Sequence, residues 1–238
     1  MNAIFKKGLL ASVLAVTASS AMAASSVDIK VTGKIVPASC TPAFTSGTGI
    51  ADFGTIKVAS LNDTTWTPLS DVKTIPITIT CEEATRVGVT FNDAHSDSAP
   101  TATLPVPYSD TDFLLTTAAT SGLGMYNSKK IGAYSMGIKK DAGTLTNDEG
   151  ENLYPIFARD ASATSGWGTK AGTHYLQVVT DKSETYSFTD VSGGDAPVAQ
   201  KQVNFIVGIM AQISPTNDLD ITDEATLDGL TNVELVYL

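Results

Sequence analysis

Residues 27–40, with the sequence VDIKVTGKIVPASC, constrain the fold of this chain more than any other stretch. From Val27 to Ile35 every second residue is apolar or glycine, and the residues between are polar. Because successive side chains of a strand point to opposite sides, this period of two predicts an extended strand with one apolar face. We expect the strand to stop at Pro37, which has no backbone N–H to donate. It leads directly to Cys40, one of two cysteines in the chain.

Residues 1–23 have the pattern of an export signal. Lys6 and Lys7 precede an apolar run, residues 8–18, that is too short to span a bilayer as a helix of the mature protein. Residues 21–23 (AMA) have the small-x-small form of a cleavage site. The sequence therefore predicts a signal peptide over 1–23 and a mature chain that begins at Ala24.

The charge of the chain excludes some partners. The net charge is −10, and removal of residues 1–23 takes two lysines with it and leaves −12. Nucleic acids and anionic membrane surfaces bind clustered Lys and Arg, so we expect neither as a partner. The mature sequence has no second long apolar run, and we expect no direct membrane insertion.

The two cysteines, Cys40 and Cys81, predict one disulfide, because an exported chain matures in an oxidising compartment. The bond would close a loop of about 42 residues and stabilise the fold by roughly 4 kcal/mol. The alternative is a pair of free buried thiols. No CxxC spacing points to a redox or zinc site.

The rest of the chain predicts an all-β fold. Thr and Val are abundant, Gly and Pro recur at short intervals, and no long stretch has an apolar period of 3.6. Seven or more short strands separated by turns predict an antiparallel sandwich in a single domain. Strands are expected at residues 50–58, 72–81, 86–92, 134–138, 153–158, 175–180, 186–189, 202–213 and 233–237.

The sequence predicts no enzyme, cofactor or metal site. His95 and His174 lie in polar loops without metal-ligand spacing, and no GxSxG nucleophile motif is present. The acids at residues 218–228 do not have the spacing of a calcium loop, and we interpret them as a solvated acidic loop. Trp66 and Trp167 lie in loops where a ring can stack on a sugar or cap the core.

Taken together, these features resemble the subunits of chaperone-usher fimbriae. The resemblance is carried by the signal peptide, the alternating segment, and four motifs: GKIVPASC at residues 33–40, DFGTI at 52–56, ITITC at 77–81, and the terminal VELVYL with its penultimate Tyr237. It covers both ends and the cysteine framework, and leaves residues 94–194 uncovered. Length and pattern are most similar to an uncharacterised group of fimbria-associated proteins, not to a major shaft pilin.

That resemblance implies an immunoglobulin-like sandwich that is incomplete and is completed by a donor strand from a partner. It implies a candidate donor segment over residues 24–32, with donor residues Val27, Ile29 and Val31, and a pilin-like domain over residues 33–238. The implied partners are a periplasmic fimbrial chaperone, an outer-membrane usher and neighbouring subunits, and the implied location is a surface fimbrium. The groove that contacts chaperone and subunit would include Val233, Leu235 and Tyr237.

Two departures from the family pattern favour a minor subunit. The extension before residue 33 is short, and Ala225 occupies the place where family pilins tend to carry a glycine. Two other interpretations of the chain stay open. Residues 27–35 can be an edge strand of their own domain, and the chain can be a complete periplasmic or secreted sandwich that binds carbohydrate through Trp66, Trp167 or Tyr126.

Overall fold

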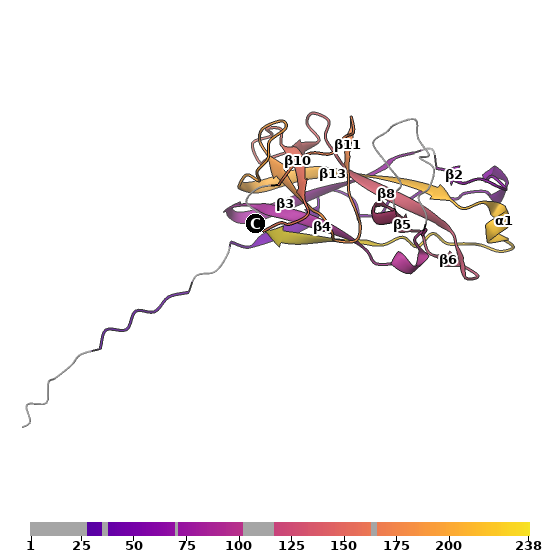
Figure 1. The fold of residues 1–238 in the computed structure, drawn as a ribbon, viewed down its shortest axis with the longest axis horizontal. Coiled ribbons are helices and arrows are strands. Elements are labelled where there is room, and N and C mark those ends of the chain that lie inside the picture. Colours follow the sequence, from indigo (N-terminus) through magenta and orange to yellow (C-terminus); the bar gives the residue numbers. More distant parts are fainter. Residues whose placement is uncertain (1–27, 35–37, 70, 102–116, 163–165) are drawn as a thin grey trace, which may run out of the picture. The chain divides into compact units, whose positions relative to one another are not determined.

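A computed structural model of the chain describes residues 28–34, 38–69, 71–101, 117–162 and 166–238 (Figure 1). The predicted signal peptide, Val27 and Ile35 lie outside the described residues. The chain divides into two units, Met1–Val36 and Pro37–Leu238. In the described residues, no helix is long and apolar enough to span a membrane.

The fold is all-β with antiparallel sheets, as the sequence predicts. The strands are β1 (Cys40–Phe44), β2 (Thr67–Pro68), β3 (Lys73–Thr85), β4 (Val87–Asp93), β5 (Ser121–Gly122), β6 (Met125–Tyr126), β7 (Lys129–Lys130), β8 (Gly132–Lys139), β9 (Leu145–Thr146), β10 (Tyr154–Ala158), β11 (Tyr175–Gln177), β12 (Thr185–Thr189), β13 (Gln200–Ile213) and β14 (Thr231–Tyr237). The helical elements are single turns at Val58–Ser60, Ser96–Ser98, Thr117–Ala119 and α1 (Thr216–Leu219).

The strands form two main sheets. The larger sheet has the order β1-β3-β13-β8-β11, with β2 and β9 paired to β13 and β5 paired to β8. The smaller sheet has the order β10-β12-β4-β14, and β6 and β7 form a separate hairpin. The long strand β13 pairs with β3 on one side and with β8 on the other, so it forms the middle of the larger sheet.

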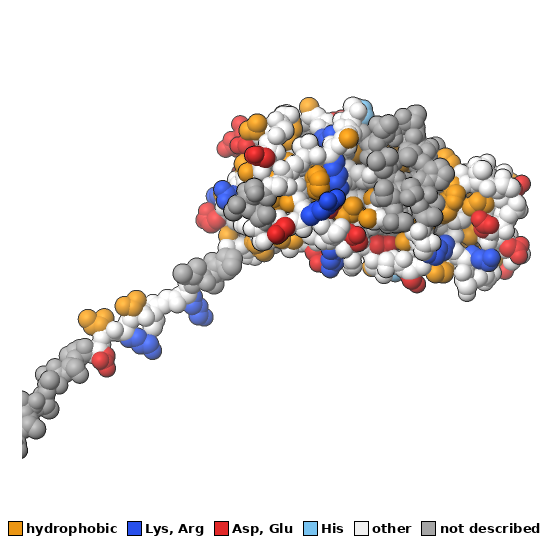
Figure 2. All heavy atoms as spheres, in the orientation of Figure 1, with side chains coloured by type: hydrophobic (Ala, Val, Ile, Leu, Met, Phe, Trp, Pro, Cys, Tyr) orange, Lys and Arg blue, Asp and Glu red, His pale blue; other side chains and the backbone are white. Residues whose placement is uncertain are grey.

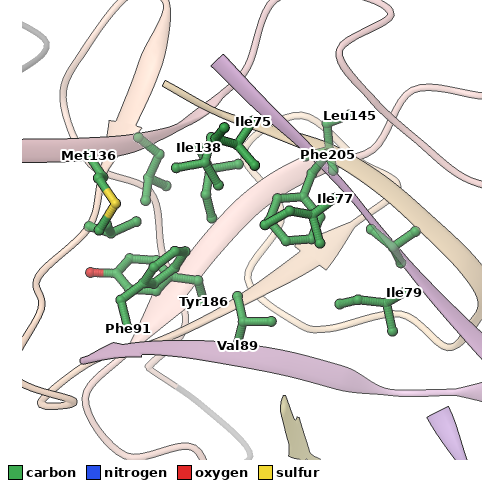
Figure 3. Packing of buried hydrophobic residues seen from close by; sticks show 14 of the residues in the cluster. Ile75, Ile77, Ile79, Val89, Phe91, Met136, Ile138, Leu145, Tyr186 and Phe205 are labelled. Carbon is green, nitrogen blue, oxygen red and sulfur yellow. The ribbon is translucent and has the colours of Figure 1, made fainter. Parts of the chain in front are cut away.

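One hydrophobic cluster joins the two sheets (Figure 3). Alternate residues of β3, among them Ile75, Ile77 and Ile79, are buried, and Phe205 of β13 is also buried. From the smaller sheet Phe188 packs on Phe205, with ring centroids 5.5 Å apart. The period of two in the sequence is therefore the spacing of side chains that face the opposite sheet.

The predicted disulfide is present between Cys40 and Cys81, which are direct partners in the β1–β3 ladder. Both cysteines are buried, so the bond fastens the start of β1 to the core. β1 ends at Phe44, where the next pair would be Thr45 and Pro76. Thr45 N–H still donates to the Pro76 carbonyl at 3.0 Å, but Pro76 has no N–H to return.

Two predicted strands are wrong. Residues 50–58 form no strand, and residues 28–34 of the N-terminal segment form none within the part that the structure describes. Gly54 in the first stretch has φ +68°, a left-handed conformation, and its N–H donates to the Asp52 carboxylate at 2.7 Å. This local turn interrupts the extended backbone. In the second stretch the alternation is present in the sequence, but the described residues 28–34 form no ladder.

Candidate functional site

Each main sheet ends in a strand with one unpaired edge. Among the described residues, β1 is an edge strand of the larger sheet and β14 is an edge strand of the smaller one. The two edges lie together, because the backbone N–H of Cys40 donates to the hydroxyl of Tyr237 at 2.9 Å. Unpaired N–H and C=O groups along such edges can pair with another strand.

A groove of about 1190 Å³ lies between these edges. Its floor is the inner face of both sheets, with Ile75 and Ile77 from β3, Val207 from β13 and Phe91 from β4. One wall comes from residues 42–44, 48–56 and 58, and the other comes from residues 221, 223–227 and 229–233. We refer to this feature as the edge groove.

Apolar side chains partly cover the floor of the edge groove. Phe53 and Ile56 from one wall, and Ile221 and Leu227 from the other, are half-buried against the main core. Both walls are largely free of strand structure, because residues 48–57 and 221–230 have none. The core is therefore closed on this side by single side chains and not by a strand.

Exposed hydrophobic residues gather at the same place. Phe44, Ile50, Val58 and Leu230 line the groove and are 52%, 71%, 45% and 48% exposed. The exposed residues Tyr237 and Leu238 lie at the end of β14. Exposed apolar residues that gather along one groove are typical of an interaction site in soluble proteins.

The far end of the edge groove is held by polar contacts. The hydroxyls of Tyr134 and Thr231 lie 2.7 Å apart, and burial raises the pKa of Tyr134 to about 12. Nδ1 of His95 lies 2.6 Å from the carbonyl oxygen of Asp228, and this hydrogen bond raises the pKa of the imidazole above its usual value. These contacts fix the wall segment just before β14.

The charged residues of the edge groove are all acidic. Asp52, Asp223 and Glu224 line it, and no Lys or Arg does so among the described residues. The hydroxyl of Tyr126 accepts the backbone N–H groups of Thr222 and Asp223 at 3.2 and 3.1 Å. Hydrogen bonds to Thr222 and then Asp223 lower the pKa of Tyr126. The acidic turn is thus fastened to the β6–β7 hairpin.

The N-terminal segment, residues 28–34, is exposed throughout (Figure 2). Ile29 and Val31, two of the predicted donor residues, are 89% and 92% exposed. Two apolar side chains on one face of such a segment leave it with an unburied surface that a groove can cover.

The structure brings some predicted site residues together and separates others. Val233 and Leu235 are half-buried against the core, and Tyr237 is 48% exposed at the end of β14. Trp167 is buried with Ile156 and Ala158. Trp66 is half-buried against Ala133.

Two other residues that the sequence singled out, Tyr126 and His174, do not line the groove. Tyr126 holds the acidic wall, whereas His174 pairs with Asp141 at 2.7 Å in an exposed position. Within the described residues, no group of three or more His, Cys, Asp or Glu side chains could hold a metal ion.

Sequence reasoning missed the second wall. The acids at residues 218–228 are exposed as predicted, but Ile221, Ala225 and Leu227 between them are half-buried. These apolar residues between the acids were the sequence feature that could have predicted the wall. Similarly, DFGTI at residues 52–56 supplies Phe53 and Ile56 to the groove without forming a strand.

Comparison with known proteins identifies the family but no activity. A family model described as "Protein of unknown function (DUF1120)" matches residues 29–135. The chain is 30% identical over 224 residues to the uncharacterised protein YhcF of Escherichia coli (strain K12), and the match covers 90% of each chain. The chain therefore belongs to the DUF1120 family.

Proposed function

We propose that this protein is a structural, non-enzymatic subunit of a surface fimbrium, and a minor one, that assembles by exchange of donor strands. Its immunoglobulin-like sandwich lacks one strand, and a strand from a partner enters the edge groove. A periplasmic chaperone occupies the groove first, an outer-membrane usher follows, and a neighbouring subunit then replaces the chaperone. The protein is exported through the periplasm to the cell surface.

The observation that carries this proposal is the pair of unpaired edges, β1 and β14, on the same side of one core. A strand placed between them would pair with backbone groups and cover the exposed rim residues Phe44, Ile50 and Leu230. It would also close the floor, where Ile75 and Ile77 now contribute to the lining of an open groove.

The N-terminal segment supplies a strand of suitable kind. Ile29 and Val31 alternate with Lys30 and Thr32, so its apolar side can face the floor while its polar side faces water. Covering each of these apolar side chains contributes about 1.5–3 kcal/mol before entropy costs.

A thermal unfolding experiment tests the proposal. The acceptor is the mature chain from Ala24 with Ile29→Ser and Val31→Ser, so that its own segment donates poorly. The ligand is a synthetic peptide of residues 24–34 in excess. At a peptide concentration of 100 Kd the acceptor gains about 2.7 kcal/mol. For a domain of this size that gain raises the unfolding midpoint by about 5–10 °C.

Two variant peptides serve as a matched pair. Ile29→Asp places a charge on the apolar face and lowers affinity about 10- to 150-fold, the equivalent of one lost side-chain burial. Thr32→Asp adds the same charge to the wet face and lowers affinity far less. A midpoint that no peptide moves, or that both variants move equally, contradicts the proposal.

Burial of Trp167, which is only 6% exposed, counts against the carbohydrate-binding alternative, because a ring that stacks on a sugar needs one open face. Trp66, which packs against Ala133, and Tyr126 are only half-buried. We propose the fimbrial role because the edge groove favours it.

A further inference from the structure

The charged residues that line the edge groove are acidic on both of its walls. Asp52 lines one wall, where the exposed Lys57 lies outside the lining, and Asp223 and Glu224 line the opposite wall. All three residues are exposed, so their carboxylates lie at the rim and not in the floor. A strand that enters the groove would pass between these walls.

Local hydrogen bonds hold two of these rim positions. The Asp52 carboxylate accepts the Gly54 N–H at 2.7 Å, which turns the chain at that point. The Asp223 backbone is anchored by the Tyr126 hydroxyl at 3.1 Å. These hydrogen bonds therefore hold the acidic residues in place at the rim of the groove.

The N-terminal segment bears lysines on its polar side. The candidate donor residues 24–32 contain Asp28 and Lys30, and Lys34 follows them, so residues 24–34 together carry +1 in a mature chain that carries −12. Lys30 and Lys34 alternate with the apolar residues Ile29 and Val31. When the apolar face lies on the floor of a groove, the lysines project along its rim.

Charge at this rim has a specific consequence for assembly. Two copies with a net charge of −12 repel each other at long range, so a local attraction is needed where they meet. Rim charges act mainly on partner choice and on association rate, because they are solvated and contribute little to affinity singly.

We propose that the acidic rim of the edge groove selects its donor strand by charge, and that it favours the lysine-bearing N-terminal segment of a second copy of this chain. The inference rests on the proposed function and adds the partner to it. A donor with acids in place of the lysines would meet repulsion from Asp52, Asp223 and Glu224.

The test uses the same mature acceptor chain and three peptides of residues 24–34: native, Lys30→Gln with Lys34→Gln, and Lys30→Glu with Lys34→Glu. Affinity is measured by calorimetry at low and high salt. We expect the doubly reversed peptide to bind about 5- to 30-fold more weakly than the native one at low salt. We expect the neutral peptide to fall between them, and the differences to shrink as salt screens the rim.

A matched pair of acceptors locates the effect. In one acceptor, Asp52→Asn, Asp223→Asn and Glu224→Gln neutralise the rim, and the preference for lysine should vanish. In the other, Asp148→Asn, Glu149→Gln and Asp190→Asn remove the same charge from exposed positions outside the groove, and the preference should persist. Circular dichroism of each free acceptor checks that the fold is intact.

The possible outcomes separate the two proposals. If all three peptides bind within twofold of one another, or if the preference survives in the rim variant, selection by charge is refuted and strand donation stands. If the native peptide does not bind at either salt, both proposals fail. A second copy as the partner is supported if the unsubstituted mature chain self-associates in sedimentation and the Lys30→Glu, Lys34→Glu chain does not; it is refuted if both behave alike.

Discussion

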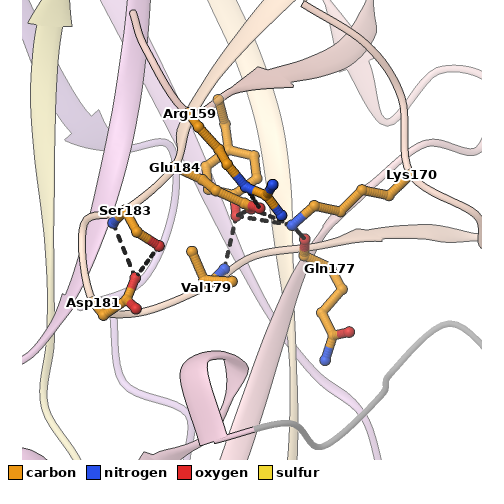
Figure 4. A network of polar contacts seen from close by, with 8 residues as sticks. Arg159, Lys170, Gln177, Val179, Asp181, Ser183 and Glu184 are labelled. Carbon is orange, nitrogen blue, oxygen red and sulfur yellow. Dashed lines mark hydrogen bonds and ion pairs between the residues drawn. The ribbon is translucent and has the colours of Figure 1, made fainter.

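Replacement of Lys170 by methionine should strongly destabilise the smaller sheet. Lys170 Nζ contacts the Glu184 carboxylate and donates to the carbonyl of Gln177 at 3.1 Å (Figure 4). It also lies 4.7 Å from the ring centre of Phe157 and 5.3 Å from that of Tyr186. The side chain of Glu184 is 6% exposed, so its charge depends on these neighbours.

The magnitude follows from what Glu184 keeps after the change. The Tyr186 hydroxyl still donates to Glu184 Oε2 at 2.5 Å, and Arg159 Nε remains 3.9 Å from Oε1. Loss of one partner of a buried pair costs about 3–5 kcal/mol. Since Lys170 is 22% exposed and Arg159 remains close to the carboxylate, we expect a cost below that range, about 2–3 kcal/mol.

Urea unfolding of a double-mutant cycle measures this energy. Lys170→Met combined with Glu184→Gln removes both charges, and it should cost less than the sum of the single changes by about 0.5–3 kcal/mol. A Lys170→Met protein within 0.5 kcal/mol of wild type at neutral pH, or strictly additive changes, would refute the reasoning.

Three further predictions concern the core and the groove. Cys40→Ala with Cys81→Ala should lower the unfolding free energy by about 4 kcal/mol, since the bond joins residues 41 apart, and should also weaken donor binding by loosening β1; an unchanged urea midpoint contradicts this. Because the pKa of Tyr134 is raised to about 12 in the folded protein, its contribution to the unfolding free energy is complete below about pH 10 and is lost as the pH rises from about 10 to about 12. The unfolding free energy should therefore fall less over that range in Tyr134→Phe than in wild type, as measured by urea unfolding at each pH. An equal fall in the two proteins counts against this prediction. Gly208→Ala should cost about 1–3 kcal/mol in urea unfolding, because its Cβ would lie 2.4 Å from a tyrosine ring of β11, whereas Gly168→Ala, with nothing within 4 Å, should stay within about 0.5 kcal/mol.

The strands of the core were predictable because their pattern records burial directly. In β3, Ile75, Ile77, Ile79 and Cys81 all face inward, and the residues between them are more exposed. The same alternation predicted β13, and the two cysteines of an exported chain predicted the disulfide that fastens β1. The all-β fold class therefore follows from the side-chain period, and the disulfide follows from the cysteine count and the export signal.

The two wrong strands show the limit of that argument. Alternation reports which face of a segment is apolar, but it does not report whether a neighbouring strand is present to pair with it. Ile29 and Val31 satisfy the pattern and are almost fully exposed. Phe53 and Ile56 contact the core from a chain that turns at Gly54 and has no ladder.

The edge groove could be placed only in part from the sequence. β14 was predicted from Val233, Leu235 and Tyr237, but its position beside β1 depends on contacts between the two ends of the chain, such as that from Cys40 to Tyr237. No local pattern encodes a pairing over that separation. The acidic second wall was missed because acids separate its apolar residues Ile221, Ala225 and Leu227, so that no strand period shows.

The most direct test of the account is hydrogen exchange along β14. One edge of this strand pairs with β4, and the other edge is open among the described residues. Without a donor, alternate amides of residues 231–237 should exchange rapidly while their neighbours are protected. With the native peptide of residues 24–34 bound, the rapid set should become protected, and the Ile29→Asp peptide should leave it rapid. Uniform protection of β14 in the free protein, or no change with the native peptide, would contradict the claim that the groove accepts a strand.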